Sequence, residues 1–501
     1  MESMKKKACV ASGHREVTRA ALTILEQGGN AFDAAIGAGF VSSVAEPALT
    51  SLGGGGFLLA RTSEGKTTLF DFFVNTPGLG GQGDLSPHFF PVTVEFPGCT
   101  QDFNVGMGSC AVPGNIKGFL HIQKHLGRLP LAEVLKPAID IARKGIPLNG
   151  KQAYFLSLLR PIMTLFKEGE EIFSPNGSYL REGDIFKNPD LADFLEALAQ
   201  EGEALFYSEI AAKIDQDMAE GQGLLTKEDL EKYQVIERRP LTTRYRGYDF
   251  ITNPPPSFGG WLIAQGLNCI EAIPLGDIQF GGRQHLESMA HFLRKWEGLR
   301  VNCPEDPECP QVEETRKYLR RLFSRGTTHL SILDHEGNAA SMTTSNGEGS
   351  GYIVPGTGIM LNNMMGEDDL HPEGFHASPP GIRVSSMMAP SMITRDGNLC
   401  YVLGSGGSKR IRSAILEVTS YCIDFGLSIR EAVDAPRIHY ENNVLQIEPG
   451  FSKEVISGLE DEFEVNVWDT IDVYFGGVHA IDAQRMEAKA DQRRGGHEEC
   501  R

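Results

Sequence analysis

The pattern of apolar and polar residues predicts two helices near the start of the chain. Apolar residues recur at helical spacing over residues 15–27, and the segment ends at a Gly-Gly pair, which is typical of a helix C-terminus. Asn30 is placed to cap a second helix, because Asp33 then lies in its first turn. The residues that follow are small and apolar on every side, so we expect a buried helix that ends near Glu46.

Alternating patterns predict strands at both ends of the chain. Residues 57–62 and 67–73 predict a hairpin, whereas 115–235 is mostly helical in pattern. A polar segment rich in Pro and Glu, residues 302–318, is interpreted as an exposed linker. Beyond it, two alternating runs flank a turn at 335–338, and a Gly-rich loop later joins a strand to a helix. We therefore expect an α/β protein whose sheet core is built from both ends of the chain.

Composition and charge exclude several classes of partner. The chain has 501 residues, of which 41% are hydrophobic and 23% charged, so an ordered protein is expected. Its net charge of −19 disfavours nucleic acids and anionic membranes as partners. The first residues include lysines but no apolar stretch follows them, and no segment is apolar for long enough to span a bilayer. We expect no signal peptide and a cytoplasmic location.

The cysteines and histidines give no sign of a metal site. Nine cysteines are widely scattered, so we expect no disulfide framework. Cys303 and Cys309 are close in sequence, but their spacing is wider than that of a zinc knuckle, and free thiols in a loop are expected. His371 and His376 have no ligand partner at a recognisable spacing and are interpreted as surface residues. No metal and no cofactor are expected.

One strand begins with residues that could perform chemistry. Gly326 precedes Thr327 and Thr328 at the entrance to a strand. A threonine hydroxyl needs a base to become a nucleophile. Cleavage of the Gly326–Thr327 bond would give Thr327 a free α-amine, which titrates near neutrality and could take the hydroxyl proton. The glycine would allow the tight bend that self-cleavage needs, although two threonines at a strand start also suit simple β-propensity.

Three other segments are compatible with ligand binding but are weak signals individually. The Gly-rich loop at 404–410 opens a helix, so its N–H groups could hold an anion or an oxyanion, although a plain tight turn fits equally well. This loop lacks the spacing of a phosphate-binding loop. The paired serines Ser385 and Ser386 could donate to a carboxylate, and acidic residues at 362–369 could face an ammonium group. Both patterns are also common in solvated loops.

Taken together and in order, these segments resemble one family. "TTHLSILDHEGNAASMTTSNGEGSGYIVPGTGIMLNN", "RVSSMMAP", "LGSGGSKR" and "EAVDAPRIHY" are similar to the small subunit of the γ-glutamyltransferase (γ-glutamyltranspeptidase) family. "QGGNAFDAAIGAGF", "SLGGGGF" and "YRGYDFITNPPPSFGG" match the large subunit. The resemblance implies an N-terminal-nucleophile hydrolase fold, a four-layer αββα sandwich. It also implies self-cleavage between Gly326 and Thr327, giving segments 1–326 and 327–501 that stay associated within one compact unit.

The resemblance assigns roles to individual residues. Thr327 matches the nucleophile, and Ser385 and Ser386 match the pair that holds the substrate α-carboxylate. The remaining correspondences are Gly406 and Gly407 for the oxyanion hole, Thr344 or Ser345 for a second hydroxyl beside the nucleophile, and Asn346 for the asparagine that follows it.

Two positions depart from the family pattern. Phe73 stands where the family has an arginine that pairs with the glutamyl α-carboxylate, and Met364 stands where it has a Gln or Glu near the α-amino group. The acidic group there corresponds to Glu367 or Asp368. Loss of a buried Arg–carboxylate contact weakens recognition by about 2–3 kcal/mol. The pattern therefore predicts intact catalytic machinery beside an acyl pocket that is more apolar.

The resemblance predicts an amide hydrolase or acyltransferase with a small-molecule substrate. Its acyl group is γ-glutamyl in the family's usual substrates, and a dicarboxylic monoamide or an acylated β-lactam side chain is the alternative. A relative that neither cleaves nor turns over, retained as a binding protein, is a second alternative, and a phosphate-loop enzyme is a third. A homo-oligomer is an open option.

Overall fold

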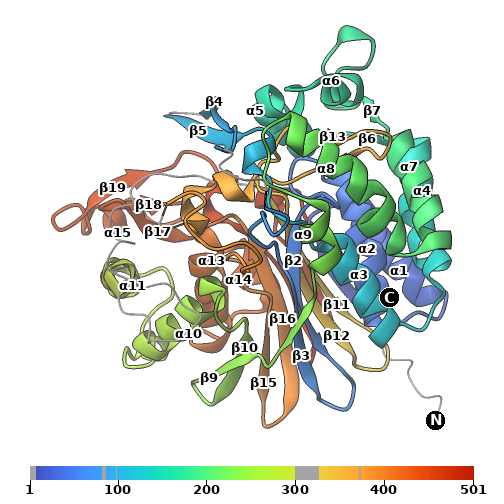
Figure 1. The fold of residues 1–501 in the computed structure, drawn as a ribbon. Coiled ribbons are helices and arrows are strands. Elements are labelled where there is room, and N and C mark those ends of the chain that lie inside the picture. The colour runs from blue at the N-terminus through green and yellow to red at the C-terminus, as the bar shows by residue number, and fades with distance from the viewer. Residues whose placement is uncertain (1–6, 82–85, 97–98, 300–325, 372–373) are drawn as a thin grey trace, which may run out of the picture.

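The computed structural model describes residues 7–81, 86–96, 99–299, 326–371 and 374–501 as two sheets packed face to face between layers of helices (Figure 1). The predicted linker at 302–318, with Cys303 and Cys309, lies outside the described residues. The first sheet has seven strands in the order β22 (His497–Cys500), β1 (Cys9–Ser12), β11 (Thr327–Leu333), β12 (Ala339–Ser345), β2 (Gly55–Arg61), β3 (Thr67–Phe72) and β8 (Ile236–Arg238). The second has six, in the order β21 (Glu487–Ala490), β20 (Gly477–Asp482), β16 (Asn398–Gly406), β15 (Ser391–Arg395), β10 (Tyr248–Thr252) and β9 (Leu241–Tyr245). The predicted αββα arrangement is thus observed.

Helices cover the outer face of each sheet. The first sheet is covered by α1 (Arg15–Glu26), α2 (Ala31–Ala45), α3 (Asn115–Leu126) and α4 (Leu131–Lys144), with α7 (Pro189–Glu201) packed on α4. The second is covered by α10 (Phe258–Ile270), α13 (Arg410–Ile423) and α14 (Ile429–Asp434), with α11 (Arg283–Leu299) beside them. The other α-helices of the described residues are α5 (Gly150–Met163), α6 (Lys167–Phe173), α8 (Ala211–Glu220), α9 (Lys227–Lys232) and α15 (Lys453–Ser457). Smaller sheets contain β4 (Phe90–Phe96) with β5 (Cys99–Val105), and β17 (Ile438–Glu441) with β18 (Val444–Ile447) and β19 (Glu464–Val467).

The two predicted N-terminal helices form as expected. Asn30 caps α2 by accepting hydrogen bonds from the N–H groups of Phe32 and Asp33, at 2.9 and 3.0 Å. The Asp33 carboxylate accepts in turn from the Asn30 N–H, which completes a capping box. Every residue of α2 is buried, because it lies between α1, α4 and the first sheet. The helix ends at Ala45, beside the predicted Glu46.

The two faces of β11 differ in polarity. Leu330 and Ile332 pack in the core between the first sheet and its helices. On the face toward the second sheet, Ser331 donates a hydrogen bond to the His479 carbonyl of β20 at 3.0 Å, and His329 lies against Gly404 of β16. The centre of the molecule therefore has a polar layer between the sheets, and Thr327 stands at one end of it.

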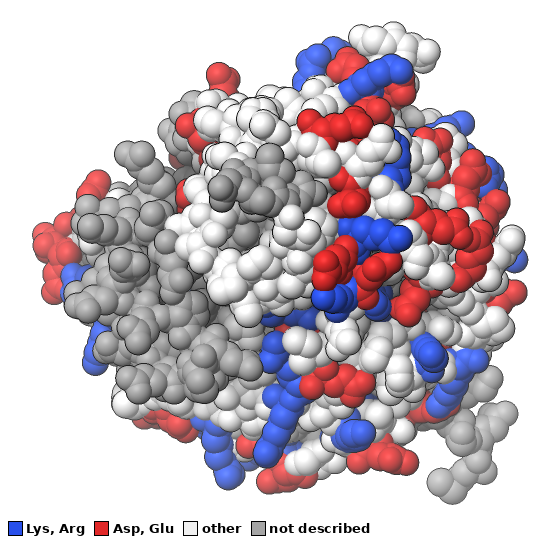
Figure 2. Space-filling model, viewed as in Figure 1, with Lys and Arg blue, Asp and Glu red and all other residues white. Residues whose placement is uncertain are grey.

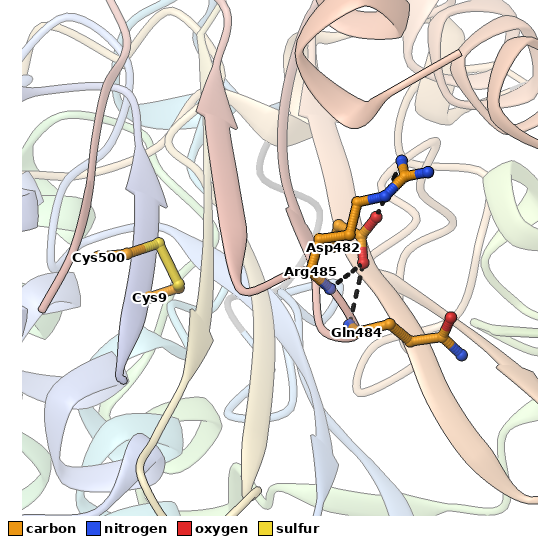
Figure 3. The surroundings of a disulfide bond; sticks show 5 residues. All are labelled: Cys9, Asp482, Gln484, Arg485 and Cys500. Carbon is orange, nitrogen blue, oxygen red and sulfur yellow. Dashed lines mark hydrogen bonds and ion pairs between the residues drawn. A yellow bond between two sulfur atoms is a disulfide. The ribbon is translucent and has the colours of Figure 1, made fainter. Parts of the chain in front are cut away.

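One disulfide corrects the expectation of free cysteines. Cys9 of β1 and Cys500 of β22 are bonded across 491 residues of sequence (Figure 3). The described free cysteines are Cys110, Cys269, Cys400 and Cys422. The pairing could not be foreseen because it depends on the first and last strands becoming neighbours in one sheet.

The surface carries mixed charge. Figure 2 shows acidic and basic side chains interspersed over the helices of the first layer, on the right of the view. Within the described part of the chain, none of the helices has the length and apolar character needed to cross a membrane.

Candidate active site

Thr327 begins β11 and lies beside the hydroxyl of Ser345. The two residues are directly paired in the β11–β12 ladder, and the Thr327 hydroxyl donates to Ser345 Oγ at 3.3 Å. Ser345 Oγ in turn donates a short hydrogen bond to the carbonyl of Gly326 and accepts one from the Gly347 N–H at 3.1 Å. A single hydroxyl therefore contacts both the candidate nucleophile and the carbonyl of the bond that it would attack.

The structure separates the two candidates for the second hydroxyl. Thr344 points to the opposite face of β12, where it accepts a hydrogen bond from the Thr50 hydroxyl at 3.1 Å. Ser345, and not Thr344, therefore lies with Thr327.

A glycine is required at position 326 because the backbone of Gly347 approaches it closely. A Cβ atom at this position would lie 1.6 Å from the carbonyl oxygen of Gly347, so no larger residue fits without backbone movement. Gly347 itself has a φ of +60° and lies against Asn363 and Glu367. The Gly-Thr sequence thus fits a crowded bend at the entrance to β11.

The Gly-rich loop lies beside Thr327. β16 ends at Gly406, where an added Cβ would lie 2.4 Å from the Thr327 carbonyl oxygen. Gly407 follows with a φ of +125°, which disfavours any residue with a side chain. The loop then leads into α13, so the backbone that approaches Thr327 at Gly406 carries no side chain.

Arg494 is a contact that the sequence patterns did not indicate. Its side chain is buried, and Nη1 donates to the Thr327 carbonyl at 3.0 Å. It follows Gln492 and Arg493 in the short 3₁₀ turn before β22, where no motif distinguishes it from other arginines. Only the packing of the C-terminal segment against β11 reveals it.

Glu46 is a second unpredicted contact, on the other side of β11. The Thr328 hydroxyl lies 3.0 and 3.1 Å from its two carboxylate oxygens and donates to them. Burial raises the pKa of Glu46 to about 7, against the opposing effects of the Thr328 hydrogen bond and the positive charge of Arg494. The sequence indicated Glu46 only as a helix end.

The predicted substrate-binding residues lie around the same bend. Asn346 is buried, and its Oδ1 has no hydrogen-bond partner among the described residues. Glu367 Oε1 would lie 2.2 Å from a Cβ on Gly347, which places this carboxylate beside the segment of Ser345. Asp368 begins the next 3₁₀ turn, and its carbonyl accepts from the His371 N–H at 3.2 Å. The geometry thus places Glu367 against this bend.

Ser385 and Ser386 are buried in the segment before β15. Ser385 Oγ donates to the Leu370 carbonyl at 3.2 Å, so it lies against the loop that carries Glu367. Ser386 Oγ accepts from the Met388 N–H at 3.1 Å, and its carbonyl accepts from Ser257 Oγ at 3.0 Å. Both hydroxyls are held in place by neighbouring backbone.

Phe73 and Met364 are both buried in the core that includes the space between the sheets. Phe73 stacks on Phe57 with ring centroids 5.5 Å apart. The Met364 carbonyl accepts a hydrogen bond from His371 Nε2 at 2.8 Å. His371 is therefore buried, which corrects the prediction of a surface residue, and burial lowers its pKa to about 4. His376 is partly buried.

The guanidinium of Arg383 lies near Phe73, but its N–H groups already donate hydrogen bonds to other groups of the protein. Arg383 Nη1 donates to the Phe73 carbonyl and, at 2.8 Å, to the Tyr233 hydroxyl. Nη2 donates to the Gln234 carbonyl at 2.8 Å, and Nε lies 3.3 Å from Asp71 Oδ1. The guanidinium thus neutralises a buried carboxylate and supports the backbone of Phe73. Within the described residues, no cluster of three or more His, Cys, Asp or Glu side chains is arranged to hold a metal ion.

Two face-to-face sheets between helical layers, with a Gly-Thr bond at the start of a central strand, define an N-terminal-nucleophile hydrolase. Residues 17–325 and 320–500 match the model of the family described as gamma-glutamyltranspeptidase, and the chain belongs to this family. Its members are hydrolases and acyltransferases formed from self-cleaved proenzymes, and the chain is an enzyme of this kind.

Individual relatives include both glutathione hydrolases and acylases. The chain is 32% identical to the glutathione hydrolase proenzyme of Escherichia coli (strain K12), covering 91% of this chain and 85% of that one. It is 31% identical to the acylase ACY 1 proenzyme of Pseudomonas sp. (strain V22), covering 90% and 85%. Among solved structures, the cephalosporin acylase from Bacillus halodurans superposes with a TM-score of 0.82 at 26% identity, covering 99% of this chain and 96% of that one.

Proposed function

We propose that Thr327, once freed by self-cleavage, hydrolyses or transfers the acyl group of an amide that is not γ-glutamyl. The observation that carries this specificity is Phe73, which packs on Phe57 in the apolar core where the family has an arginine. The catalytic groups and the acyl pocket are argued separately below.

Self-cleavage begins with the Thr327 hydroxyl. Its oxygen attacks the Gly326 carbonyl carbon, while the hydrogen bond from Ser345 stabilises the negative charge that develops on the carbonyl oxygen. The C–N bond breaks, the acyl group moves to the Thr327 oxygen, and the former amide nitrogen becomes an amine. Water then hydrolyses the ester, which leaves Gly326 with a carboxylate and Thr327 with a free hydroxyl and a free amine.

Turnover uses the same hydroxyl with its own amine as the base. The amine takes the hydroxyl proton as Oγ1 attacks the substrate amide, and it returns a proton to the leaving amine. The backbone of Gly406 lies beside the Thr327 carbonyl and that of Gly407 beside Arg494, which supports their N–H groups as the donors to the oxyanion. The positive charge of Arg494 beside Thr327 lowers the pKa of the amine and so favours its free base. Water or an acceptor amine then resolves the acyl-enzyme.

Among the described residues, the positions that correspond to the acyl site carry no available cation for a glutamyl α-carboxylate. Phe73 and Met364 are apolar and buried, and the nearby Arg383 is held by Asp71 and by backbone carbonyls. Ser386, whose Oγ only accepts from the Met388 N–H, keeps a hydroxyl proton that could hold one carboxylate, whereas Ser385 would first have to release the Leu370 carbonyl. A dicarboxylic monoamide or the side chain of an acylated β-lactam satisfies this combination better than a zwitterionic glutamyl group.

A γ-glutamyl substrate is the second candidate, because one part of its usual recognition remains. The Glu367 carboxylate lies against Gly347, and Asn346 Oδ1 is a buried acceptor without a partner among the described residues. Both oxygens could accept hydrogen bonds from a substrate α-ammonium group.

Steady-state kinetics with two anilides that differ only in the α-amino group separates these candidates. We expect kcat/KM for glutaryl p-nitroanilide to exceed that for γ-glutamyl p-nitroanilide by about 10-fold or more, because an α-ammonium group would be buried beside Met364, where the family has a Gln or Glu to hold it. A higher value for the γ-glutamyl substrate would overturn the proposed specificity and leave the mechanism intact. Loss of both activities in Thr327→Ala is the control for the nucleophile.

A further inference from the structure

We propose that Glu46 is a positioning residue for the nucleophile: it holds the start of β11 through Thr328, and its charge opposes that of Arg494 beside Thr327. The inference rests on the proposed function, because it needs Thr327 to act through its α-amine. It adds a residue, on the helix side of the sheet, that no motif or family correspondence indicated.

The geometry around Glu46 is tightly constrained. Glu46 follows the last residue of α2, and both it and Thr328 are buried, at 1% and 5% exposure. Gly13 packs against the pair, since a Cβ there would lie 2.4 Å from Glu46 Oε1 and 2.8 Å from Thr328 Oγ1. Three segments distant in sequence thus meet so that one carboxylate can accept the hydroxyl of the residue next to Thr327.

This carboxylate is in an unfavourable place for stability. It is removed from water, and it stands at the C-terminal end of α2, where the helix dipole disfavours negative charge. An uncharged side chain that hydrogen-bonds Thr328 would avoid both costs. The pKa of Glu46 is about 7 because burial raises it, whereas the Thr328 hydrogen bond and the positive charge of Arg494 lower it.

The groups that face Glu46 come from three elements. Thr328 donates from β11, Arg494 provides positive charge from the turn before β22, and Gly13 lies in the loop before α1. His14 follows Gly13 and uses Nδ1 to accept the Glu16 N–H, and burial lowers its pKa to about 4, so it is neutral at physiological pH. Among these groups, Arg494 is the one whose charge acts on Glu46.

The consequence is a defined effect on the pH dependence. Ionised Glu46 partly cancels the field of Arg494, whose guanidinium touches the Thr327 carbonyl. Removing this negative charge from beside the start of β11 lowers the pKa of the Thr327 amine, because less negative charge then stabilises the protonated form. The free-base amine then persists to lower pH, so the acid limb of the kcat profile moves in the same direction.

The test compares pH profiles of kcat for wild type and Glu46→Gln. We expect complete self-cleavage in both and an acid limb displaced by about 0.5 pH units or more toward low pH in E46Q. Glu417→Gln is the matched control, because Glu417 is also a buried carboxylate with a raised pKa, of about 8, but it accepts from the Ile438 N–H in another part of the fold. Its profile should coincide with that of wild type.

Coincident profiles for an active E46Q and wild type would overturn the inference. If E46Q does not fold, Thr328→Val gives the same test, since loss of its hydrogen bond keeps Glu46 protonated to higher pH and should move the limb in the same direction. If the acid limb of the kcat profile of Thr328→Val coincides with that of wild type, the inference is also overturned. Failure of wild type itself to cleave or turn over would instead refute the proposed function.

A second inference rests on the disulfide. We infer that the two segments produced by self-cleavage stay covalently joined through Cys9 and Cys500. Cys9 belongs to 1–326 and Cys500 to 327–501, and β1 and β22 are antiparallel neighbours. The backbones of Ala8 and Arg501 exchange two hydrogen bonds, at 2.6 and 2.9 Å, so the adjacent cysteines form a non-hydrogen-bonded pair with Cα atoms 4.1 Å apart.

The bond also anchors the segment that delivers Arg494. β1 lies between β22 and the nucleophile strand β11, and Arg494 stands in the turn that leads into β22. In Figure 3 the disulfide joins β1 to the end of the chain. The link thus spans the two products of cleavage close to the strand on which the reaction depends.

Mass spectrometry of the cleaved protein with its free thiols blocked tests this link. We expect one species with the mass of the full chain plus one water and the blocking groups on the free thiols, less the two hydrogens lost in the disulfide, which separates into two fragments after reduction. Cys500→Ser should give two fragments without reduction, and Cys422→Ser, which changes a free cysteine, should behave as wild type. Two free fragments in unreduced wild type would overturn the inference, whereas an uncut chain after reduction would refute self-cleavage instead.

Discussion

Adjacent hydroxyls in β12 have opposite surroundings, and the difference decides which one assists Thr327. Ser345 contacts the Thr327 hydroxyl and the Gly326 carbonyl, whereas Thr344 is bonded to Thr50 on the other face. The sequence left both open because the shortened loop after β12 does not fix the register of the match. Pairing of Thr327 with Ser345 in the ladder resolves it.

Ser345→Ala should therefore slow self-cleavage by about 10²-fold, the effect of removing one donor to a developing oxyanion, and it should also lower kcat because Ser345 Oγ orients the Thr327 hydroxyl. Thr344→Val, which changes the neighbouring residue but not this contact, should change either rate only slightly. Rates of fragment formation and of anilide hydrolysis check both variants. Equal effects in the two variants would contradict the assignment.

Glu46 also predicts a pH dependence of stability. Its pKa is raised from 4.5 to about 7 in the folded protein, so the folded state holds a proton that the unfolded state has released between these values. The stability associated with this proton is present below pH 4.5 and is lost as the pH rises through about 7. Glu46→Gln, which does not titrate, should gain up to about 3 kcal/mol relative to wild type between these limits.

Urea unfolding of both proteins at pH 4.5 and at pH 8 measures this difference. The result that conflicts with the account is a free-energy difference between the variants that is the same at the two pH values.

At the scale of elements, the sequence predicted those helices and strands whose formation depends on residues close together in the chain. The cap of α2 depends on residues three apart, and the predicted cap by Asn30 is confirmed, while the reciprocal bond from Asp33 was not predicted. The predicted hairpin also forms, although β2 begins at Gly55 rather than at residue 57, because its glycines pair with β12 and β3. The buried position of His371 was missed, because its partner is a carbonyl in a loop with no regular pattern.

Asn30→Ala provides a test of the α2 cap. Asn30 accepts two backbone N–H groups and also donates Nδ2 to the Leu126 carbonyl at 2.6 Å, so its loss should cost about 2 kcal/mol. Asn149→Ala is the control, because Asn149 is less buried and accepts from one N–H, of Gln152, at the start of α5. It should cost about 1 kcal/mol. Urea unfolding with unchanged m-values measures both, and equal losses would contradict the additional role of Asn30.

At the scale of the whole molecule, the segments on either side of Gly326 are interleaved in both sheets. The first sheet places β11 and β12 between β1 and β2, and the second places β10 beside β15. The resemblance predicted one compact unit, and the mixed strand order gives its physical reason. The proximity of Arg494, Glu46 and Cys500 to β11 arises only at this scale, which is why sequence patterns did not indicate it. The cytoplasmic location stays a prediction, and the disulfide makes it worth testing because such bonds are rare in the cytosol.

Residues 327–501 alone should therefore not fold. Without β1 and β2, both sides of the β11–β12 pair would expose unpaired backbone and apolar surface. Amide spectra of this fragment should show no dispersed resonances, and co-expression with 1–326 should restore them. A well-dispersed spectrum of the isolated fragment would contradict the shared-core description.

The central claim is that Thr327 is a nucleophile exposed by its own chemistry. The most direct measurement is the intact mass of reduced wild type beside Thr327→Ala, with N-terminal sequencing of the smaller fragment. We predict two fragments in wild type, the smaller one beginning Thr-Thr-His, and a single chain in the variant. A single full-length chain in both after long incubation would contradict the claim, because Thr327 would then lack the amine that serves as its base.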